Sequence, residues 1–454
     1  MRKYKEIIAE LENETGKKFK QAKFEIDSWS FDDFARFELN ETKQIIKLKL
    51  NRSGLDKIPQ AVFEIETLRE ISLEDNNISG IPEGFTNLKD LRFLNLAYNK
   101  FTEIPLNLGN FTHLQALDMS NNNIESLPAN IKKTQTLLDL NLSRNPLKVI
   151  SADIIKFSNL SYLNLLETGL SELPEEFSKL KNLQVLDLSN NEFTETPKVL
   201  ESLVKLNRLY LSGNKISIFP SFLSALPALH FINLGFNEIF AISSKISGFK
   251  KIKTISLDYN RISTLPKEFS ELKTLHKLDL AGNPLDVFPK ELLKIKKLSE
   301  LNLIGTNISE IPEEISELKY LTVLLLMGNN IQTLPSGLFA LKNLEHLELG
   351  LNKISEIPIK ISNLKNLKTL SFSQGNTIIY IPKEILKLKN LEILDLSGND
   401  VNTIPSYLLN LNMEILFQEK GKGIILEGNP IKTPPIKIVK KGRLAIAKYY
   451  ESLK

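Results

Sequence analysis

Residues 344–366 read LEHLELGLNKISEIPIKISNLKN, and the spacing of the apolar residues in this stretch recurs along most of the chain. Aligning the leucines gives the pattern L-x-x-L-x-L-x-x-N-x-I-x-x-I-P-x-x-I-x-x-L-x-x. Its first apolar position falls every 23 residues from Ile45 to Leu367, and the next step, to Leu391, is 24 residues. A degenerate final copy follows around Ile424. A period of this length predicts roughly seventeen stacked structural repeats.

Each slot of the pattern has its own physical role. The L-x-L core alternates with period two, as a short strand does, so the residues that flank the leucines face solvent. The asparagine that follows the strand segment in the pattern, for example Asn99, offers both donor and acceptor groups to the loop backbone. Proline, for example Pro358, suits the first position of a short helical turn.

Charge is also distributed by slot. Acidic residues follow the proline and lysines close the same segment, which complements the helix dipole. These lysines include Lys319, Lys342, Lys365 and Lys389. We therefore interpret most of the charged residues as a solvated convex face.

The pattern resembles the leucine-rich-repeat family over nearly the whole chain. The resemblance implies an α/β fold, a leucine-rich-repeat solenoid over residues 45–435. A single repeat cannot bury its apolar face alone, so neighbours must stack. The expected object is a curved horseshoe with a parallel β-sheet on the concave face and short helical or 3-10 turns on the convex face.

The N-terminal segment, residues 1–44, does not fit the repeat, and we predict that it caps the first repeat, because an open solenoid must cover its ends. It contains an amphipathic helix candidate with Tyr4, Ile7, Ile8 and Leu11. An aromatic cluster follows, made of Phe24, Trp29, Phe31, Phe34 and Phe37.

The C-terminal segment, residues 436–454, is predicted to be a capping helix or a junction. Residues 429–450 read NPIKTPPIKIVKKGRLAIAKYY, which resembles the junction that precedes a Ras-like GTPase domain in Roco-family proteins. The resemblance implies the repeat half of a Roco-like small-GTPase signalling protein, or its regulator. The chain itself holds no G-x-x-x-x-G-K-[ST] phosphate loop, since Gly421-Lys422-Gly423 lacks that spacing.

Composition is that of a soluble globular protein, with 42% hydrophobic and 25% charged residues. There is no cysteine, which excludes disulfides and thiolate metal sites, and the N-terminal residues lack an apolar signal core. We expect a cytoplasmic protein without a membrane span. The net charge is +4, with nine Lys and Arg against three Glu in residues 418–454. This tail is interpreted as a solvated helix or a docking surface for an acidic partner, and nucleic-acid binding is not expected.

Residues that could support catalysis or bind metal are scattered. The four histidines, His113, His230, His276 and His346, have no partner pattern of a metal site. Asp118, Asp187, Asp279 and Asp395 share one concave slot, but no two are in adjacent repeats, whereas paired-carboxylate catalysis needs two groups that converge on one bond. We therefore predict no enzyme activity, no metal and no cofactor.

Large apolar residues on the expected concave face are the candidate partner-binding site, because soluble monomers rarely expose large contiguous apolar patches. A central group comprises Tyr162, Leu166, Val185, Tyr210, Phe231, Phe236 and Tyr259. A second group contains Val323, Leu325 and Met327, with Ile304 and Leu351 beside them. The alternative is that these residues pack on one another or on neighbouring loops.

The concave apolar groups and the C-terminal segment lead to two hypotheses about function. The first hypothesis is a protein–protein interaction scaffold or recognition module, expected to be monomeric, that binds a protein partner on its concave face. The alternative is the repeat half of a Roco-like signalling system, for which a small GTPase is one candidate partner.

Overall fold

The computed structural model describes residues 3–23, 35–128, 135–411, 413–417 and 421–454. It divides into two compact units, which are described separately. Unit 1 comprises residues 1–216 and 225–232, and unit 2 comprises residues 217–224 and 233–454. The boundary falls inside two elements, the 3-10 helix η7 (Ser221–Ala225) and the strand β11 (Phe231–Asn233).

Unit 1 begins with one α-helix and continues as strands that alternate with 3-10 helices. Its α-helix is α1 (Tyr4–Thr15). Its strands are β1 (Phe19–Gln21), β2 (Ala35–Leu39), β3 (Ile45–Lys49), β4 (Glu70–Ser72), β5 (Phe93–Asn95), β6 (Ala116–Asp118), β7 (Asp139–Asn141), β8 (Tyr162–Asn164), β9 (Val185–Asp187) and β10 (Arg208–Tyr210). Its 3-10 helices are η1 (Gln60–Glu64), η2 (Glu83–Asn87), η3 (Leu106–Asn110), η4 (Ala152–Phe157), η5 (Glu175–Lys179) and η6 (Lys198–Ser202).

Unit 2 repeats the same alternation and ends in two α-helices. Its strands are β12 (Thr254–Ser256), β13 (Lys277–Asp279), β14 (Glu300–Asn302), β15 (Val323–Leu325), β16 (His346–Glu348), β17 (Thr369–Ser371), β18 (Ile393–Asp395), β19 (Ile415–Leu416) and β20 (Gly423–Ile425). Its 3-10 helices are η8 (Ser244–Gly248), η9 (Lys267–Glu271), η10 (Lys290–Lys294), η11 (Glu313–Glu317), η12 (Ser336–Ala340), η13 (Ile359–Asn363), η14 (Lys383–Lys387) and η15 (Ser406–Asn410). Its α-helices are α2 (Ile436–Val439) and α3 (Arg443–Glu451).

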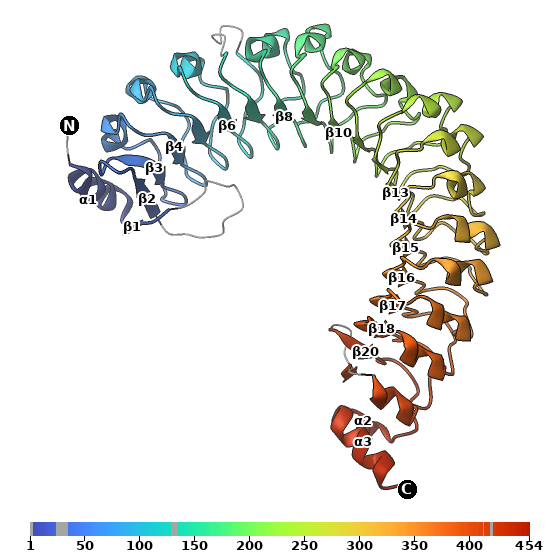
Figure 1. Cartoon of the computed structure of the whole chain (residues 1–454). Coiled ribbons are helices and arrows are strands. Elements are labelled where there is room, and N and C mark those ends of the chain that lie inside the picture. The colour runs from blue at the N-terminus through green and yellow to red at the C-terminus, as the bar shows by residue number, and fades with distance from the viewer. Residues whose placement is uncertain (1–2, 24–34, 129–134, 412, 418–420) are drawn as a thin grey trace. The chain divides into compact units, whose positions relative to one another are not determined.

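Within each unit the strands lie along one edge and the 3-10 helices along the other (Figure 1). Neighbouring strands pair in parallel with the register that the 23-residue period predicts, so that Leu140 lies opposite Leu163 in unit 1 and Leu301 opposite Leu324 in unit 2. The predicted fold class, an α/β leucine-rich-repeat solenoid, is therefore confirmed. Among the described strands, one pair departs from the expected parallel sheet: β2 pairs antiparallel with β3, because β2 belongs to the N-terminal segment and not to a repeat.

The turns on the helical edge are 3-10 helices, which decides between the two forms that the sequence allowed. Most follow a proline, as η5 follows Pro174, whose extended backbone precedes the first helical residue. Each turn contributes an apolar side chain to the core, and Phe177 and Phe269 are both fully buried. Burying a side chain of this size stabilises the fold by about 1.5–3 kcal/mol.

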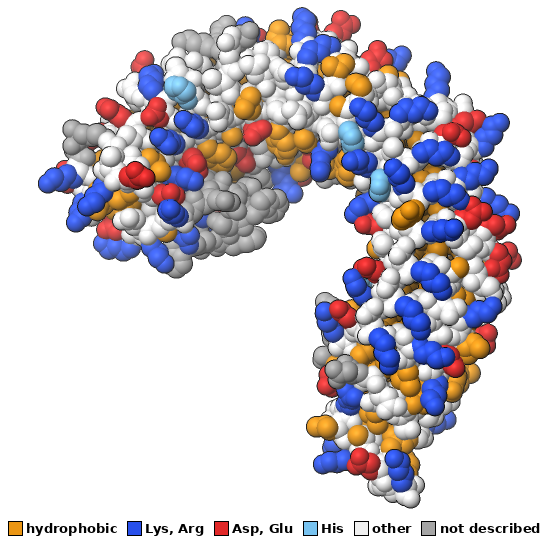
Figure 2. Space-filling view, in the orientation of Figure 1, with side chains coloured by type: hydrophobic (Ala, Val, Ile, Leu, Met, Phe, Trp, Pro, Cys, Tyr) orange, Lys and Arg blue, Asp and Glu red, His pale blue; other side chains and the backbone are white. Residues whose placement is uncertain are grey.

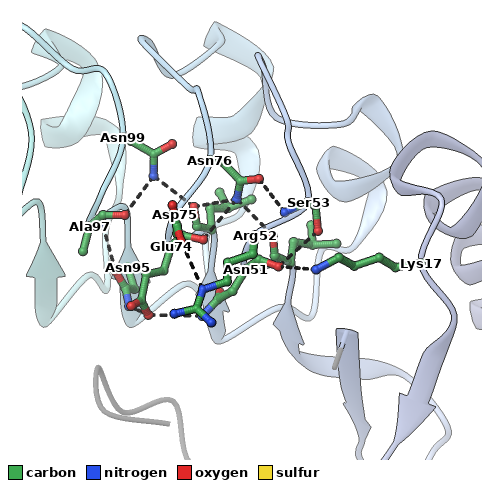
Figure 3. Close-up of polar contacts among 12 residues, drawn as sticks. Lys17, Asn51, Arg52, Ser53, Glu74, Asp75, Asn76, Asn95, Ala97 and Asn99 are labelled. Atoms are coloured by element: carbon green, nitrogen blue, oxygen red, sulfur yellow. Dashed lines mark hydrogen bonds and ion pairs between the residues drawn. The ribbon is translucent and has the colours of Figure 1, made fainter. Parts of the chain in front are cut away.

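The asparagine slot satisfies the loop backbone between repeats (Figure 3). Asn76 Oδ1 accepts hydrogen bonds from the backbone N–H groups of Ser53 and Leu55, at 2.9 and 3.0 Å. Its Nδ2 donates to the carbonyl oxygens of Leu50 and Leu73. Asn376 forms the equivalent hydrogen bonds, although the extra residue in its repeat moves it off the 23-residue spacing. These amides link each repeat to the one before it.

At the N-terminal end, α1 packs on the first repeat as the amphipathic pattern predicts. Ile7, Ile8 and Leu11 are buried, and the Tyr4 ring lies 6.0 Å from that of Phe37, centroid to centroid. Of the predicted aromatic cluster, Phe24, Trp29, Phe31 and Phe34 lie outside the described residues. The segment 1–44 as a cap stays a prediction.

At the C-terminal end, α2 and α3 follow the last strand. Ile446 and Val439 are buried, and the hydroxyl of Tyr450 donates to the carbonyl of Ile404. The Arg443 guanidinium donates to the carbonyl of Leu409 at 2.6 Å. Among the described residues, no helix is long and apolar enough to cross a membrane.

Candidate protein-recognition surface

The strand face of unit 1 gathers the candidate residues that lie in that unit. In β8, β9 and β10 the central leucine is buried and the flanking side chains are partly or fully exposed. The strand register places Tyr162 beside Val185, and Val185 beside Arg208. Leu166 lies two residues beyond β8 and is also half-buried. Predicted residues and their neighbours thus share one continuous side of the sheet.

An aromatic pair with a cation beside it forms the centre of this surface. The rings of Tyr210 and Phe231 lie 4.8 Å apart, centroid to centroid, with planes tilted by 43°. The Arg208 guanidinium carbon lies 5.9 Å from the centroid of the Phe231 ring, within range of a cation–π interaction. Both rings are only half-buried, so each keeps a surface that a partner could cover.

Carboxylates lie next to the aromatic residues. Asp187 is directly opposite Tyr210 in the strand register, and its Oδ1 accepts the backbone N–H of Ser189 at 2.8 Å. Burial raises the pKa of Asp187, and burial also raises the pKa of Asp118. Among the described residues, neither carboxylate has a lysine or arginine within ion-pair distance.

Burial and the charges of these two aspartates also raise the pKa values of two further residues. Burial, and then the charge of Asp187, raise the pKa of the Tyr162 hydroxyl, which therefore stays a hydrogen-bond donor at neutral pH. Burial and the charge of Asp118 raise the pKa of Glu74, whose carboxylate accepts from Asn51 and Asn95 at 3.1 and 3.3 Å (Figure 3). This part of the strand face therefore combines aromatic rings with carboxylates that are partly buried and poorly solvated.

The burial of Asp187 predicts a pH-dependent change in stability. Because its pKa is raised in the folded protein, its contribution to stability is complete only below the unfolded pKa of about 3.9 and is lost as pH rises through the folded pKa. Asp187→Asn removes the ionisation, and Asn164 shows that an asparagine fits this slot, since its Oδ1 accepts the N–H of Leu166 at 2.9 Å. We expect the variant to have a higher free energy of unfolding than the wild type at pH 7.

Urea unfolding at pH 7 and at about pH 3 would measure this difference, which should disappear at the lower pH because both states are then protonated. The exposed Asp400→Asn changes the net charge equally and is the matched control. An equal gain for both variants at pH 7 would show that the net charge, not the burial of Asp187, is responsible.

Unit 2 carries the other two residues of the central group, Phe236 and Tyr259. Their rings stack at 4.6 Å with an angle of 18° between the planes, and they are 58% and 53% exposed. Both residues have positive φ, 53° and 51°, which is uncommon for aromatic side chains. Gly282 leaves room for the stack, since a Cβ there would lie 2.7 Å from Cδ1 of Tyr259.

The second predicted group also lies in unit 2, on β15 and just beyond it. Val323 is flanked in the register by Glu300 and His346, and Leu325 by Asn302 and Glu348. Val323, Leu325 and Met327 are half-buried. Polar neighbours therefore border Val323 and Leu325 on both sides, whereas half-buried Ile304 occupies the slot one repeat before Met327, and Leu351 is exposed.

Two features of the surface escaped the sequence reasoning. Arg208 precedes Phe231 by 23 residues, one repeat, so their proximity could have been read from the period alone. Asp187 was considered only as a catalytic carboxylate, and its position beside Tyr210 was overlooked. The described residues contain no group of three or more His, Asp or Glu side chains that could hold a metal ion.

Comparison with known families gives matches along the chain. Models described as a leucine-rich repeat region match residues 137–238 and 290–377, and leucine rich repeat models match 44–101, 227–285, 89–133 and 390–411. No curated protein matches the chain.

Solved structures give the same result. A leucine-rich-repeat protein of Leptospira interrogans is 34% identical over 87% of this chain and 93% of its own, with a TM-score of 0.69. The plant peptide hormone receptor RGFR1, solved in complex with RGF2, is 28% identical over 82% of this chain and 61% of its own, with a TM-score of 0.62. The ectodomain of the Arabidopsis thaliana receptor kinase GASSHO1/SCHENGEN3, in complex with CASPARIAN STRIP INTEGRITY FACTOR 2, is 26% identical over 89% of this chain and 59% of its own, with a TM-score of 0.62. The chain therefore belongs to the leucine-rich-repeat family.

Proposed function

We propose that this protein is a recognition module that binds a polypeptide segment on the strand face of unit 1. The observation that carries the proposal is the aromatic pair of Tyr210 and Phe231 beside the carboxylate of Asp187. The leucine-rich-repeat fold is commonly used for protein–protein recognition, and two structures similar to this chain are plant receptors in complex with RGF2 and with CASPARIAN STRIP INTEGRITY FACTOR 2.

The chemistry of the surface defines the partner. Half-buried aromatic rings favour an apolar side chain, because covering them removes apolar area from water. Asp187 and Asp118 are carboxylates without a cationic neighbour among the described residues, and burial raises the pKa of each. A lysine or arginine of the partner would supply that missing charge. The expected ligand is a segment with an apolar residue and a basic residue close together.

Affinity capture from the native lysate tests the proposal. The double variant Tyr210→Ser, Phe231→Ser should lose the partner that the wild-type chain retains, because both rings of the pair are removed. Phe240→Ser is the matched control, since Phe240 is a 58% exposed aromatic residue outside the strands. Quantitative mass spectrometry of the three eluates gives the readout.

Retention of the same partner by the double variant would contradict the proposal, provided that its circular dichroism spectrum matches that of the wild type. Loss of the partner from the Phe240→Ser control as well would contradict it too, because the effect would then not belong to the strand face of unit 1.

A second candidate function rests on the Roco-like string at residues 429–450. In this alternative the repeats are the recognition half of a small-GTPase signalling system. The string forms α2 and α3, which leave Leu444 80% exposed. The gene sequence after the codon of Lys454 tests this alternative: a continuing frame that encodes G-x-x-x-x-G-K-[ST] supports it, and a stop codon argues against a GTPase in the same chain.

A further inference from the structure

A row of lysines runs along one side of unit 2. The slot two residues before the first leucine of the strand segment holds lysine in seven successive repeats. These residues are Lys250, Lys273, Lys296, Lys319, Lys342, Lys365 and Lys389, and all seven are exposed. Figure 2 shows Lys and Arg side chains gathered along the face of unit 2 turned toward the viewer. The row follows the direction in which the repeats stack.

The fold does not require lysine in this slot. Lys273 and Lys296 donate to carbonyl oxygens of their own 3-10 turns, those of Ser270 and Leu293, at 2.7 and 3.3 Å. In unit 1 the same slot is mixed: it holds lysine in some repeats, such as Lys89 and Lys181, and other residues before the same kind of strand elsewhere, including Glu66, Thr112, Ser158 and Val204. The favourable interaction of these lysines with the helix dipole, which the sequence pattern indicated, therefore accounts for only part of the row.

Four lysines of the row have no hydrogen bond or ion pair at Nζ among the described residues: Lys250, Lys319, Lys342 and Lys389. The acidic residues of this side bind other lysines: Glu317 pairs with Lys296, Glu345 with Lys368 and Glu392 with Lys422. Lys296 lowers the pKa of Glu317 most, and the charge of Lys319 adds to this effect, so Lys319 is compensated in part although it forms no ion pair.

The backbone of three successive lysines of the row accepts hydrogen bonds from side-chain amides. Asn343 donates to the carbonyl oxygen of Lys319 at 2.7 Å, and Asn366 donates to that of Lys342 at 3.0 Å. Asn390 donates to the carbonyl of Lys365 at 3.0 Å. Each amide lies one repeat after the lysine that it holds.

We propose that this lysine row binds an extended acidic polypeptide segment. Alternate side chains of an extended chain project to one side about every 6.6–6.8 Å, a distance that the flexible four-carbon stem of lysine can match. The row is a single line of charges on a chain whose net charge is only +4, which favours a peptide over a nucleic-acid duplex. This surface lies in unit 2, so it is independent of the strand face of unit 1.

The test is binding of a fluorescent peptide of about 16 residues that alternates Glu and Ser, measured by anisotropy on the full chain at low salt. The triple variant Lys319→Glu, Lys342→Glu, Lys389→Glu should bind about tenfold more weakly. The matched control is Lys267→Glu, Lys290→Glu, Lys383→Glu, which changes the net charge equally at exposed lysines that begin the 3-10 helices of the same unit. The control should retain most of the wild-type affinity.

Equal losses in the two triple variants would overturn the proposal, because binding would then follow net charge and not the row. Absence of binding by the wild-type chain at low salt would overturn it as well. Tighter binding of an oligothymidine with the same number of charges, lost in the row variant alone, would assign the row to single-stranded nucleic acid instead and so reject the acidic peptide.

Discussion

Asn283→Ala should lower the free energy of unfolding of unit 2 by about 2–4 kcal/mol, since buried backbone groups left without partners cost about 1–3 kcal/mol each. The Asn283 side chain is 1% exposed. Its Oδ1 accepts the N–H of Ile262 at 2.9 Å, and its Nδ2 donates to the carbonyls of Leu257 and Leu280 at 2.8 and 2.9 Å. Alanine fills none of these roles. Urea unfolding measures the loss, and hydrogen exchange of the Ile262 amide locates it.

The chain supplies a graded control for this experiment. Thr306 occupies the equivalent slot one repeat later, where its hydroxyl bonds to the carbonyl of Leu303 and to Asn329. Asn283→Thr should therefore lose less stability than Asn283→Ala, while Asn363→Ala, at an exposed asparagine, should leave it unchanged. If the alanine and threonine variants were equally stable, the hydrogen bonds would not be what the slot contributes.

The same slot shows how much of this fold could be predicted from sequence. Repetition fixes the register, because every strand position recurs in the next repeat and a stacked neighbour is the only way to bury the apolar face. Asn376 lies off the 23-residue spacing because one inserted residue breaks the period locally, so the period alone does not predict it, although the loop backbone still requires an amide at that place. The antiparallel pairing of β2 with β3 could not be predicted, since residues 1–44 carry no repeat to set a register.

The candidate site was predictable only as far as it follows the period. Slot spacing places Tyr210 one repeat before Asn233 and Arg208 one repeat before Phe231, yet the ring contact of Tyr210 with Phe231 runs diagonally between slots. Such a contact depends on side-chain rotamers, which alternation does not determine. The burial of Asp187 likewise depends on the volume of the side chains packed around it, which alternation does not determine. Charge and ring geometry therefore came from the structure, whereas the choice of face came from the sequence.

The carboxylate beside the aromatic pair provides the sharpest test of the partner's chemistry. Asp187→Lys places a cation where we propose that the partner's basic residue lies, and like charges brought together at an interface cost several kcal/mol. We therefore expect at least about a thirtyfold increase in Kd for the captured partner, which corresponds to roughly 2 kcal/mol. Isothermal titration calorimetry on the full chain measures it, with Asp286→Lys, at an exposed aspartate of unit 2, as the control of equal charge.

Replacing the partner's basic residues one at a time with glutamate completes the argument. One of these changes should weaken binding to the wild-type chain and restore binding to the Asp187→Lys variant, because the pair of charges is then exchanged rather than lost. Such a rescue cannot arise from misfolding of the variant or from a general effect of net charge, because each of the two changes, made without the other, weakens binding. If no single glutamate restores affinity, Asp187 does not face a cation, and the aromatic pair must bind its partner without that contact.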